Sequence, residues 1–110
     1  MTHEFGIMEI APLQNARYDI YEPEKYDCIK VHDNYIELLL NQLETVDTCW
    51  HTLERPEKGL AYHGITIIPP SSLTAFMSVL ESQSNSAYEP LILLVKQAIC
   101  NQKYIIHFGI

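Results

Sequence analysis

The chain has 110 residues, of which 47% are hydrophobic and 19% are charged, with seven lysines and arginines against fourteen aspartates and glutamates. This length predicts a single globular domain over residues 1–110, because two separate domains would each be too small to bury a stable core. The composition excludes intrinsic disorder and collagen-like repeats. The net charge of −7 argues against a nucleic acid or an anionic membrane as partner, since both depend on lysine and arginine for binding.

The first residues lack the basic and apolar segments of a secretory signal peptide. The longest aliphatic run, Leu91–Val95, is far shorter than a membrane span requires. The cysteines, Cys28, Cys49 and Cys100, are widely spaced and odd in number, which is typical of a reducing compartment. We therefore expect a cytoplasmic protein.

Apolar residues with helical or alternating spacing outline the secondary structure in chain order. They predict strands over residues 5–10, 28–32, 48–53, 60–68 and 104–108, and helices over residues 34–46, 71–83 and 90–100. Asn34 is the expected N-cap of the first helix. Residues 54–59 are expected to form a hairpin loop that places Leu53 opposite Leu60. In the last strand, Ile105 and His107 share one face, and Ile106 and its neighbours share the other.

From Cys28 onward the predicted order is β-α-β-β-αα-β, which is the ferredoxin-like element order with a helical pair in place of the second helix. We therefore predict an α+β fold, a two-layer sandwich with an extra N-terminal strand at a sheet edge. An α+β sandwich with other strand pairing is the alternative. The predicted core includes one or two residues from each main element, namely Leu39, Leu40, Phe76, Leu94 and Ile106.

The histidines and cysteines form no pattern typical of a metal or cofactor site, such as CxxC or HExxH. We expect no cofactor and no metal, with the cysteines in or near the core and the histidines at the sheet margins. Cys49 lies close to His51 in sequence and across the predicted hairpin from His63, which leaves a minor cysteine–histidine enzyme as an alternative. No glycine-rich turn or oxyanion motif accompanies this pair, so we expect that the protein is not an enzyme.

Negative charge is concentrated in the first half of the chain. Residues 1–58 contain twelve acidic and five basic side chains, whereas residues 59–110 contain two of each. Within the first half, residues 18–27 combine tyrosines, which are frequent at binding hot spots, with carboxylates, which attract basic partners. The candidate binding residues are Tyr18, Asp19, Tyr21, Glu22, Glu24, Tyr26 and Asp27, and the predicted hairpin adds Trp50 and Arg55. The alternative for residues 18–27 is a solvated loop without a partner.

These features favour a small acidic protein-binding module that recognises a basic partner protein, such as a toxin or a nuclease. An immunity or antitoxin-type inhibitor is the most specific form of this hypothesis. A small-molecule-binding or regulatory α+β domain is the alternative, because such folds accept unrelated ligands. An exposed strand at either margin of the sheet would allow two copies to pair.

Overall fold

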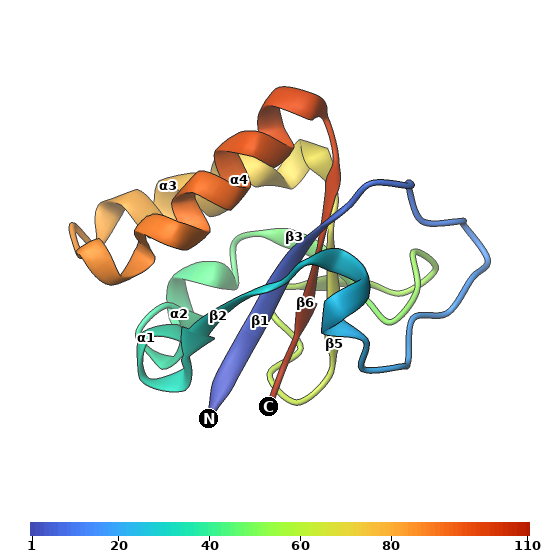
Figure 1. Ribbon diagram of the computed structural model, residues 1–110, viewed down its shortest axis with the longest axis horizontal. Coiled ribbons are helices and arrows are strands. Elements are labelled where there is room, and N and C mark those ends of the chain that lie inside the picture. Colours follow the sequence, from blue (N-terminus) through green and yellow to red (C-terminus); the bar gives the residue numbers. More distant parts are fainter.

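A computed structural model describes residues 1–110 and shows a six-stranded antiparallel sheet with helices on one face (Figure 1). The strands are β1 (Thr2–Met8), β2 (Ile29–His32), β3 (Asp47–Trp50), β4 (Pro56–Lys58), β5 (Ile65–Ile68) and β6 (Tyr104–Phe108). The helices are α1 (Asp33–Glu37), α2 (Leu40–Leu43), α3 (Leu73–Ser82) and α4 (Glu89–Asn101), with 3₁₀ turns η1 (Pro23–Tyr26), η2 (Pro70–Ser72) and η3 (Ser86–Tyr88). The predicted α+β two-layer fold is confirmed. None of the helices is long and apolar enough to cross a lipid bilayer.

The order of strands in the sheet is β2-β1-β6-β5-β3-β4, which differs from the predicted ferredoxin-like arrangement. The N-terminal strand does not extend an edge. Instead β1 lies between β2 and β6, because its residues are buried from His3 to Met8 and hydrogen-bond to a neighbour on each side. The element order also contains an additional strand, β4, which the sequence patterns did not indicate.

The predicted hairpin register is wrong. Trp50 lies opposite Thr66 and Cys49 opposite Ile67, whereas Leu53 and Leu60 lie outside the strands. His51 and Gly59 both adopt left-handed backbone conformations, with φ of 65° and 69°. His51 directly follows β3 and Gly59 directly follows β4, so each residue ends the strand before it. Residues 56–58, predicted as loop, therefore fold back on β3 as the short edge strand β4.

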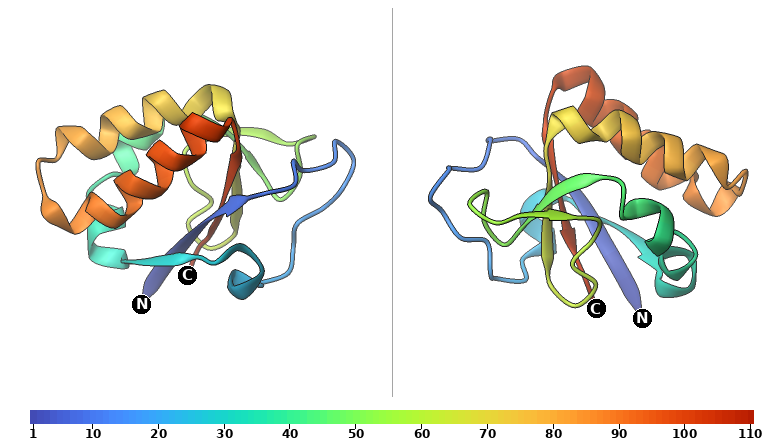
Figure 2. Two further views of the ribbon diagram at one scale, coloured as in Figure 1. Left: turned by 45° about the horizontal axis from the view of Figure 1, so that its top comes forward. Right: turned by 180° about the vertical axis from the view of Figure 1, so that it is seen from behind.

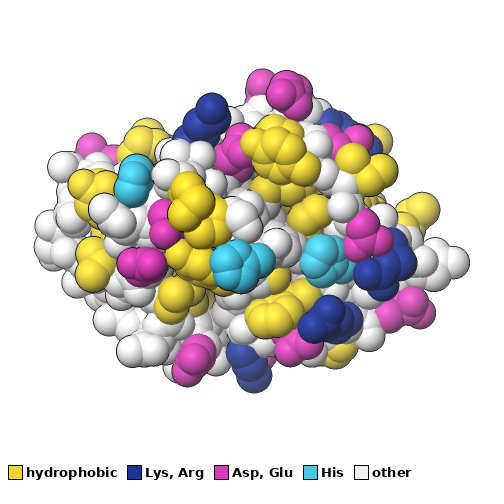
Figure 3. Space-filling view, turned by 90° about the horizontal axis from the view of Figure 1, so that it is seen from below, with side chains coloured by type: hydrophobic (Ala, Val, Ile, Leu, Met, Phe, Trp, Pro, Cys, Tyr) yellow, Lys and Arg dark blue, Asp and Glu magenta, His cyan; other side chains and the backbone are white.

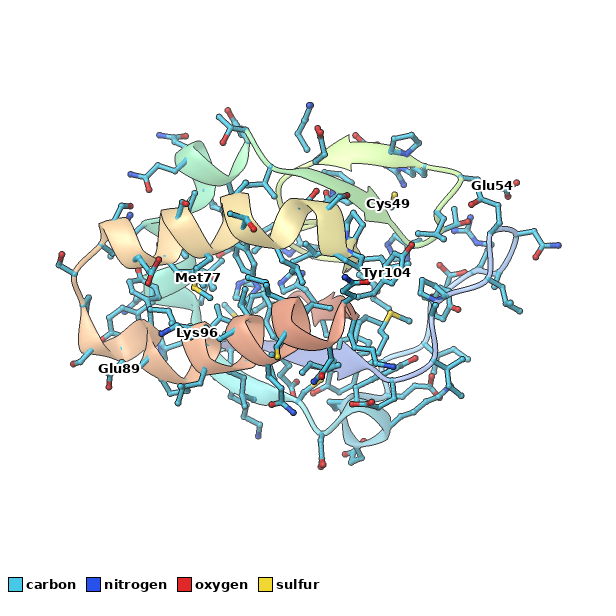
Figure 4. The ribbon with its side chains drawn as sticks, turned by 90° about the horizontal axis from the view of Figure 1, so that it is seen from above. Cys49, Glu54, Met77, Glu89, Lys96 and Tyr104 are labelled. Atoms are coloured by element: carbon cyan, nitrogen blue, oxygen red, sulfur yellow. The ribbon has the colours of Figure 1, made fainter.

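The sheet has an apolar cluster on each face. On one face α3 and α4 lie side by side (Figure 4), and the main core joins them to inward residues of the strands, such as Phe5 and Ile105. On the other face Met8, Ile65, Ile67, Ile106 and Phe108 form a smaller cluster, covered by the segment between β1 and β2. The predicted split of β6 between the two faces is confirmed, because Ile105 lies in the main core and Ile106 in the smaller cluster.

The first predicted helix is interrupted at residues 38–39. The backbone N–H of Leu39 donates to the carbonyl of Ile36 at 2.9 Å, which tightens the chain into a 3₁₀-like turn. Ile36 and Leu39 therefore both point into the core, and Leu40 is only half-buried. His32, not Asn34, caps α1: its Nδ1 accepts the backbone N–H of Asn34 at 3.1 Å.

Three of the five predicted core residues, Leu39, Phe76 and Ile106, are fully buried. Leu40 and Leu94 are half-buried and pack against the margin of the main core. The exposed Cys100 also departs from its expected place in or near the core, whereas Cys28 and Cys49 are half-buried.

Candidate functional site

Residues 9–28, which we call the strap, connect β1 to β2 and contain only the short turn η1. The strap projects beyond the sheet at the opposite end of the molecule from the α3–α4 connection and then returns across the outer face (Figure 2). On that face Tyr18, Tyr26 and Cys28 pack against the smaller apolar cluster. The strap is thus an ordered covering layer made from the predicted binding segment.

Gly6 explains how closely the strap approaches the sheet. A Cβ atom at this position would lie 2.6 Å from the carbonyl oxygen of Tyr26, 2.7 Å from its Cβ and 2.8 Å from the Sγ of Cys28. Any side chain larger than hydrogen would push η1 away from β1. Glycine is therefore required here for contact between the strap and the sheet.

Polar contacts fix the strap at two further points. The Tyr21 hydroxyl donates to the buried carboxylate of Glu4, and this hydrogen bond, aided by desolvation, raises the pKa of Tyr21 to about 12. The backbone N–H of Tyr18 donates to the carbonyl of His51 at 2.7 Å. The His51 Nδ1 also lies 2.8 Å from a carboxylate oxygen of Asp19. His51 was predicted as a strand residue, and its left-handed backbone turns it toward the strap instead.

The predicted binding residues fall into two groups within the strap. Tyr18, Glu22 and Tyr26 are half-buried, and burial raises the pKa of Tyr26. The exposed group consists of Asp19, Tyr21, Glu24 and Asp27. Only one of the three tyrosines, Tyr21, therefore presents most of its side chain to solvent, with 63% of its surface exposed.

Trp50 and Arg55 lie apart from the strap on the β3–β4 hairpin. The Arg55 guanidinium stacks 5.4 Å from the centre of the Trp50 ring, and its Nε donates to Glu57 at 2.9 Å. The Trp50 Nε1 donates to the carbonyl of Gly59 at 3.1 Å. No hydrogen bond or ion pair joins these two side chains to the strap, so the structure does not bring the two predicted patches together.

Two adjacent hollows follow the strap. The larger, about 450 Å³, lies between η1 and α4 and includes Glu9 and Leu94 in its wall. The smaller, about 310 Å³, lies over β1 and β2 and includes Glu4 and Lys30. Glu24 and Asp27 line both hollows. A third, of about 230 Å³, lies where His51, Asp19 and His63 meet. Figure 3 shows histidine, acidic and apolar side chains intermingled on the face at which both chain ends lie.

A buried polar network crosses the helix-facing side of the sheet. His3 Nε2 lies 2.8 Å from a carboxylate oxygen of Asp33, and His3 Nδ1 lies 2.9 Å from His107 Nε2. His107 Nδ1 in turn lies 3.0 Å from the Thr66 hydroxyl, which accepts the backbone N–H of Ala61 at 2.8 Å. Both histidines are fully buried, which corrects the expectation that the histidines lie at the sheet margins.

With both rings neutral, the hydrogen-bonding pattern fixes their tautomers. A carboxylate only accepts, so His3 carries its proton on Nε2 and accepts from His107 Nε2–H. His107 then accepts the Thr66 hydroxyl proton on Nδ1. In this arrangement both rings are neutral. Burial lowers the pKa of His3 despite its bond to Asp33. Burial also lowers the pKa of His107 well below its usual value, and the adjacent His3, which would repel a second positive charge if it were protonated, lowers it further.

Tyr62 connects the network to the surface. Its hydroxyl donates to the same oxygen of Asp33 at 2.5 Å and lies 3.3 Å from a carboxylate oxygen of Glu37. The hydrogen bonds from Tyr62 and His3 lower the pKa of Asp33. None of the hollows described above is lined by His3, His107 or Thr66.

Cys28 and Cys49 are not activated as nucleophiles. Burial raises the pKa of both Cys28 and Cys49, to about 12 for Cys28, and the Cys49 thiol contacts the carbonyl of Leu53 at 3.7 Å. A raised pKa leaves little thiolate at neutral pH. No group of three or more histidine, cysteine or acidic side chains is arranged to hold a metal ion.

No protein-family model matches this chain, and no curated protein or solved structure is significantly similar to it.

Proposed function

We propose that this protein is a cytoplasmic binding module that recognises a basic partner protein through the strap. Its specific role in this proposal is that of an immunity or antitoxin-type inhibitor, which covers the cationic active surface of a toxin or nuclease. An inhibitor of this kind needs a surface that combines negative charge with apolar contact area.

The composition of the exposed strap carries the proposal. Four of the nine large hydrophobic side chains that the protein exposes lie on it, although it comprises only residues 9–28. They are Ile10 at 85% exposure, Leu13 at 67%, Ile20 at 70% and Tyr21 at 63%. Exposed apolar side chains that form a patch mark protein–protein interaction sites.

The charges on the strap favour a basic partner over a neutral one. Asp19, Glu24 and Asp27 are exposed among the apolar side chains, and Glu22 is half-exposed. The strap has two basic side chains. Arg17 pairs with Asp19 at 2.8 Å, and Lys25 lies 3.8 Å from Glu22. Desolvated apolar contacts would supply affinity, and the carboxylates would raise the association rate.

Small-molecule binding is the second candidate function. It is supported by the third hollow, where the imidazole of His51 is oriented by Asp19 beside His63. Its volume of about 230 Å³ is below the usual range for small-molecule sites, roughly 300–1,000 Å³, which makes it the weaker candidate.

Site-specific photo-crosslinking tests the proposal. A benzophenone amino acid at position 20 should capture a basic partner from the host, with an isoelectric point above about 9. The matched control is position 93, because Leu93 is 65% exposed on α4, outside the strap. Equal capture at both positions, or a partner at position 20 that is acidic, would contradict the proposal.

A further inference from the structure

The smaller of the two hollows along the strap, with a volume of about 310 Å³, has a buried carboxylate in its wall. Glu4 is only 6% exposed, yet it lines this hollow together with Tyr21 and Lys30. We call this space the Glu4 hollow. A carboxylate removed from water is costly unless hydrogen-bond donors replace its hydration, so its partners indicate whether the site is complete.

The hydrogen bonding of Glu4 is incomplete. Its Oε1 accepts the hydroxyl of Tyr21, and no donor of the chain bonds to Oε2. No side-chain oxygen in the protein is both fully buried and without a partner. Oε2 is therefore not fully buried, and Glu4 lines the hollow. A nearly buried carboxylate with one oxygen free of hydrogen bonds thus lines a space open to a ligand.

The charges around this oxygen attract a cation. Glu24 and Asp27 also line the hollow, and neither forms an ion pair. Lys30 lies opposite Glu4 in the β1–β2 register but pairs with no carboxylate. Three carboxylates and one unpaired ammonium group therefore line the hollow. Beside them, burial and the charges of Glu4, Asp27 and Glu24 raise the pKa of Cys28.

We propose that the Glu4 hollow is a subsite for a guanidinium group, and that the basic partner inserts an arginine side chain into it. The inference rests on the proposed function and names the group that this surface recognises. A guanidinium presents five donors in one plane, so it can reach Oε2 of Glu4 and a rim carboxylate together. It is also less strongly hydrated than an ammonium, which suits a carboxylate that is already desolvated.

The walls of the hollow fit this group better than they fit a metal ion. The exposed ring of Tyr21 and the ring of Pro23 form an apolar wall for the methylene stem of an arginine. The three carboxylates do not form a cluster arranged to hold a metal.

Titration with capped amino acids, followed by amide NMR shifts, tests the subsite directly. N-acetyl-arginine amide should bind with a dissociation constant in the millimolar range and shift the amides of Tyr21 and Cys28. N-acetyl-citrulline amide has the same shape without the charge and should bind about tenfold more weakly or not at all. Equal binding of the two would overturn the proposal. The guanidinium could come from a partner's arginine side chain or from free arginine, and titration with free arginine distinguishes the two. If free arginine binds about tenfold more tightly than the capped form, the ligand is a small molecule and not a partner's side chain.

Substitutions test which carboxylates contribute to binding of N-acetyl-arginine amide. Glu4→Gln retains an acceptor for Tyr21 but removes the charge, and should weaken binding of N-acetyl-arginine amide about tenfold. Glu44→Gln removes one exposed carboxylate outside the hollow and should leave it unchanged. If Glu4→Gln unfolds, the exposed pair Glu24→Gln with Asp27→Asn should still weaken binding. Wild-type affinity in the folded Glu4→Gln protein, or in that pair, would overturn the subsite.

The outcome is independent of the test of the proposed function. Capture of a basic partner at position 20 without binding of N-acetyl-arginine amide would leave the binding module intact and reject the subsite. Binding of the amide without capture of any partner would keep the guanidinium site and reject the proposed partner.

Discussion

At the level of single residues, Gly6 offers the most direct test of how the strap is held. Gly6→Ala should destabilise the protein by about 1–3 kcal/mol, because the methyl group would overlap Tyr26 and Cys28, one of the contacts being a backbone carbonyl. Urea unfolding measures the change. Ser78→Ala, at an exposed position of α3, is the control and should shift stability by less than about 0.5 kcal/mol. A similarly small effect at Gly6 would mean that the strap does not lie against β1.

The neutral histidine pair predicts a pH dependence of stability. Because the pKa values of His3 and His107 are lower in the folded protein than in the unfolded chain, the unfolded chain binds more protons below about pH 6.5. The free energy of unfolding should therefore be highest above pH 6.5 and should fall as the pH drops toward the folded-state pKa values. The slope for each histidine reaches at most about 1.4 kcal/mol per pH unit.

His107→Gln isolates this contribution. Glutamine retains a donor and an acceptor but does not titrate, so the variant should be less stable at pH 7 and should lose less further stability between pH 7 and pH 5. Denaturant unfolding at several pH values measures both slopes. Parallel slopes for the two proteins would show that His107 is not the responsible group.

At the level of elements, the break between α1 and α2 predicts that two adjacent leucines contribute differently to the stability of the protein. Leu39→Ala should cost about 2–5 kcal/mol, because Leu39 is fully buried in the main core. Leu40→Ala should cost less, because Leu40 is half-buried at the margin of that core. Thermal or urea unfolding of the two variants gives the order. A larger loss for Leu40 would indicate a continuous helix over residues 34–46, as the sequence pattern alone predicts.

The elements that were predictable from sequence are those whose own apolar pattern indicates which of their residues are buried. The strand at residues 104–108 and the helices near residues 71–83 and 90–100 match β6, α3 and α4 closely. Each helix buries one apolar face, and the strand places alternate residues on the two faces of the sheet. The hairpin was not predictable, because its register depends on left-handed backbone at His51, and histidine gives no local signal for that conformation. The position of β1 inside the sheet depends on long-range pairing.

The candidate site was predictable only in part. The strap corresponds to the acidic tyrosine-rich segment, although two of its three tyrosines pack onto the sheet. Glu4 and the histidine network were missed, because their burial follows from the pairing of β1 with β6. The alternation of Ile105 and His107 was a usable signal, since it places His107 on the same face as a core residue.

At the level of the whole molecule, the asymmetry of charge predicts the kinetics of partner binding. Replacing Glu22 and Glu24 by glutamine should lower the association rate, and the difference from wild type should shrink as salt rises. The matched control replaces Glu81 and Glu89, which changes the net charge equally but lies in the near-neutral second half. Stopped-flow or surface-based association at several ionic strengths measures the rates. Equal slowing by both pairs would show that only total charge matters.

The position of β1 and β6 in the middle of the sheet has a consequence for biosynthesis. β1 can pair with β6 only after residues 104–108 have been synthesised, because Glu4 pairs with Phe108 and Met8 with Tyr104. During translation, β2 is the only neighbour available to β1, and a two-stranded ribbon is marginally stable in water. The nascent chain therefore holds its apolar strands unprotected until residues 104–108 have left the ribosome. A chain that stops at residue 103 should fail to fold and should depend on chaperones for solubility.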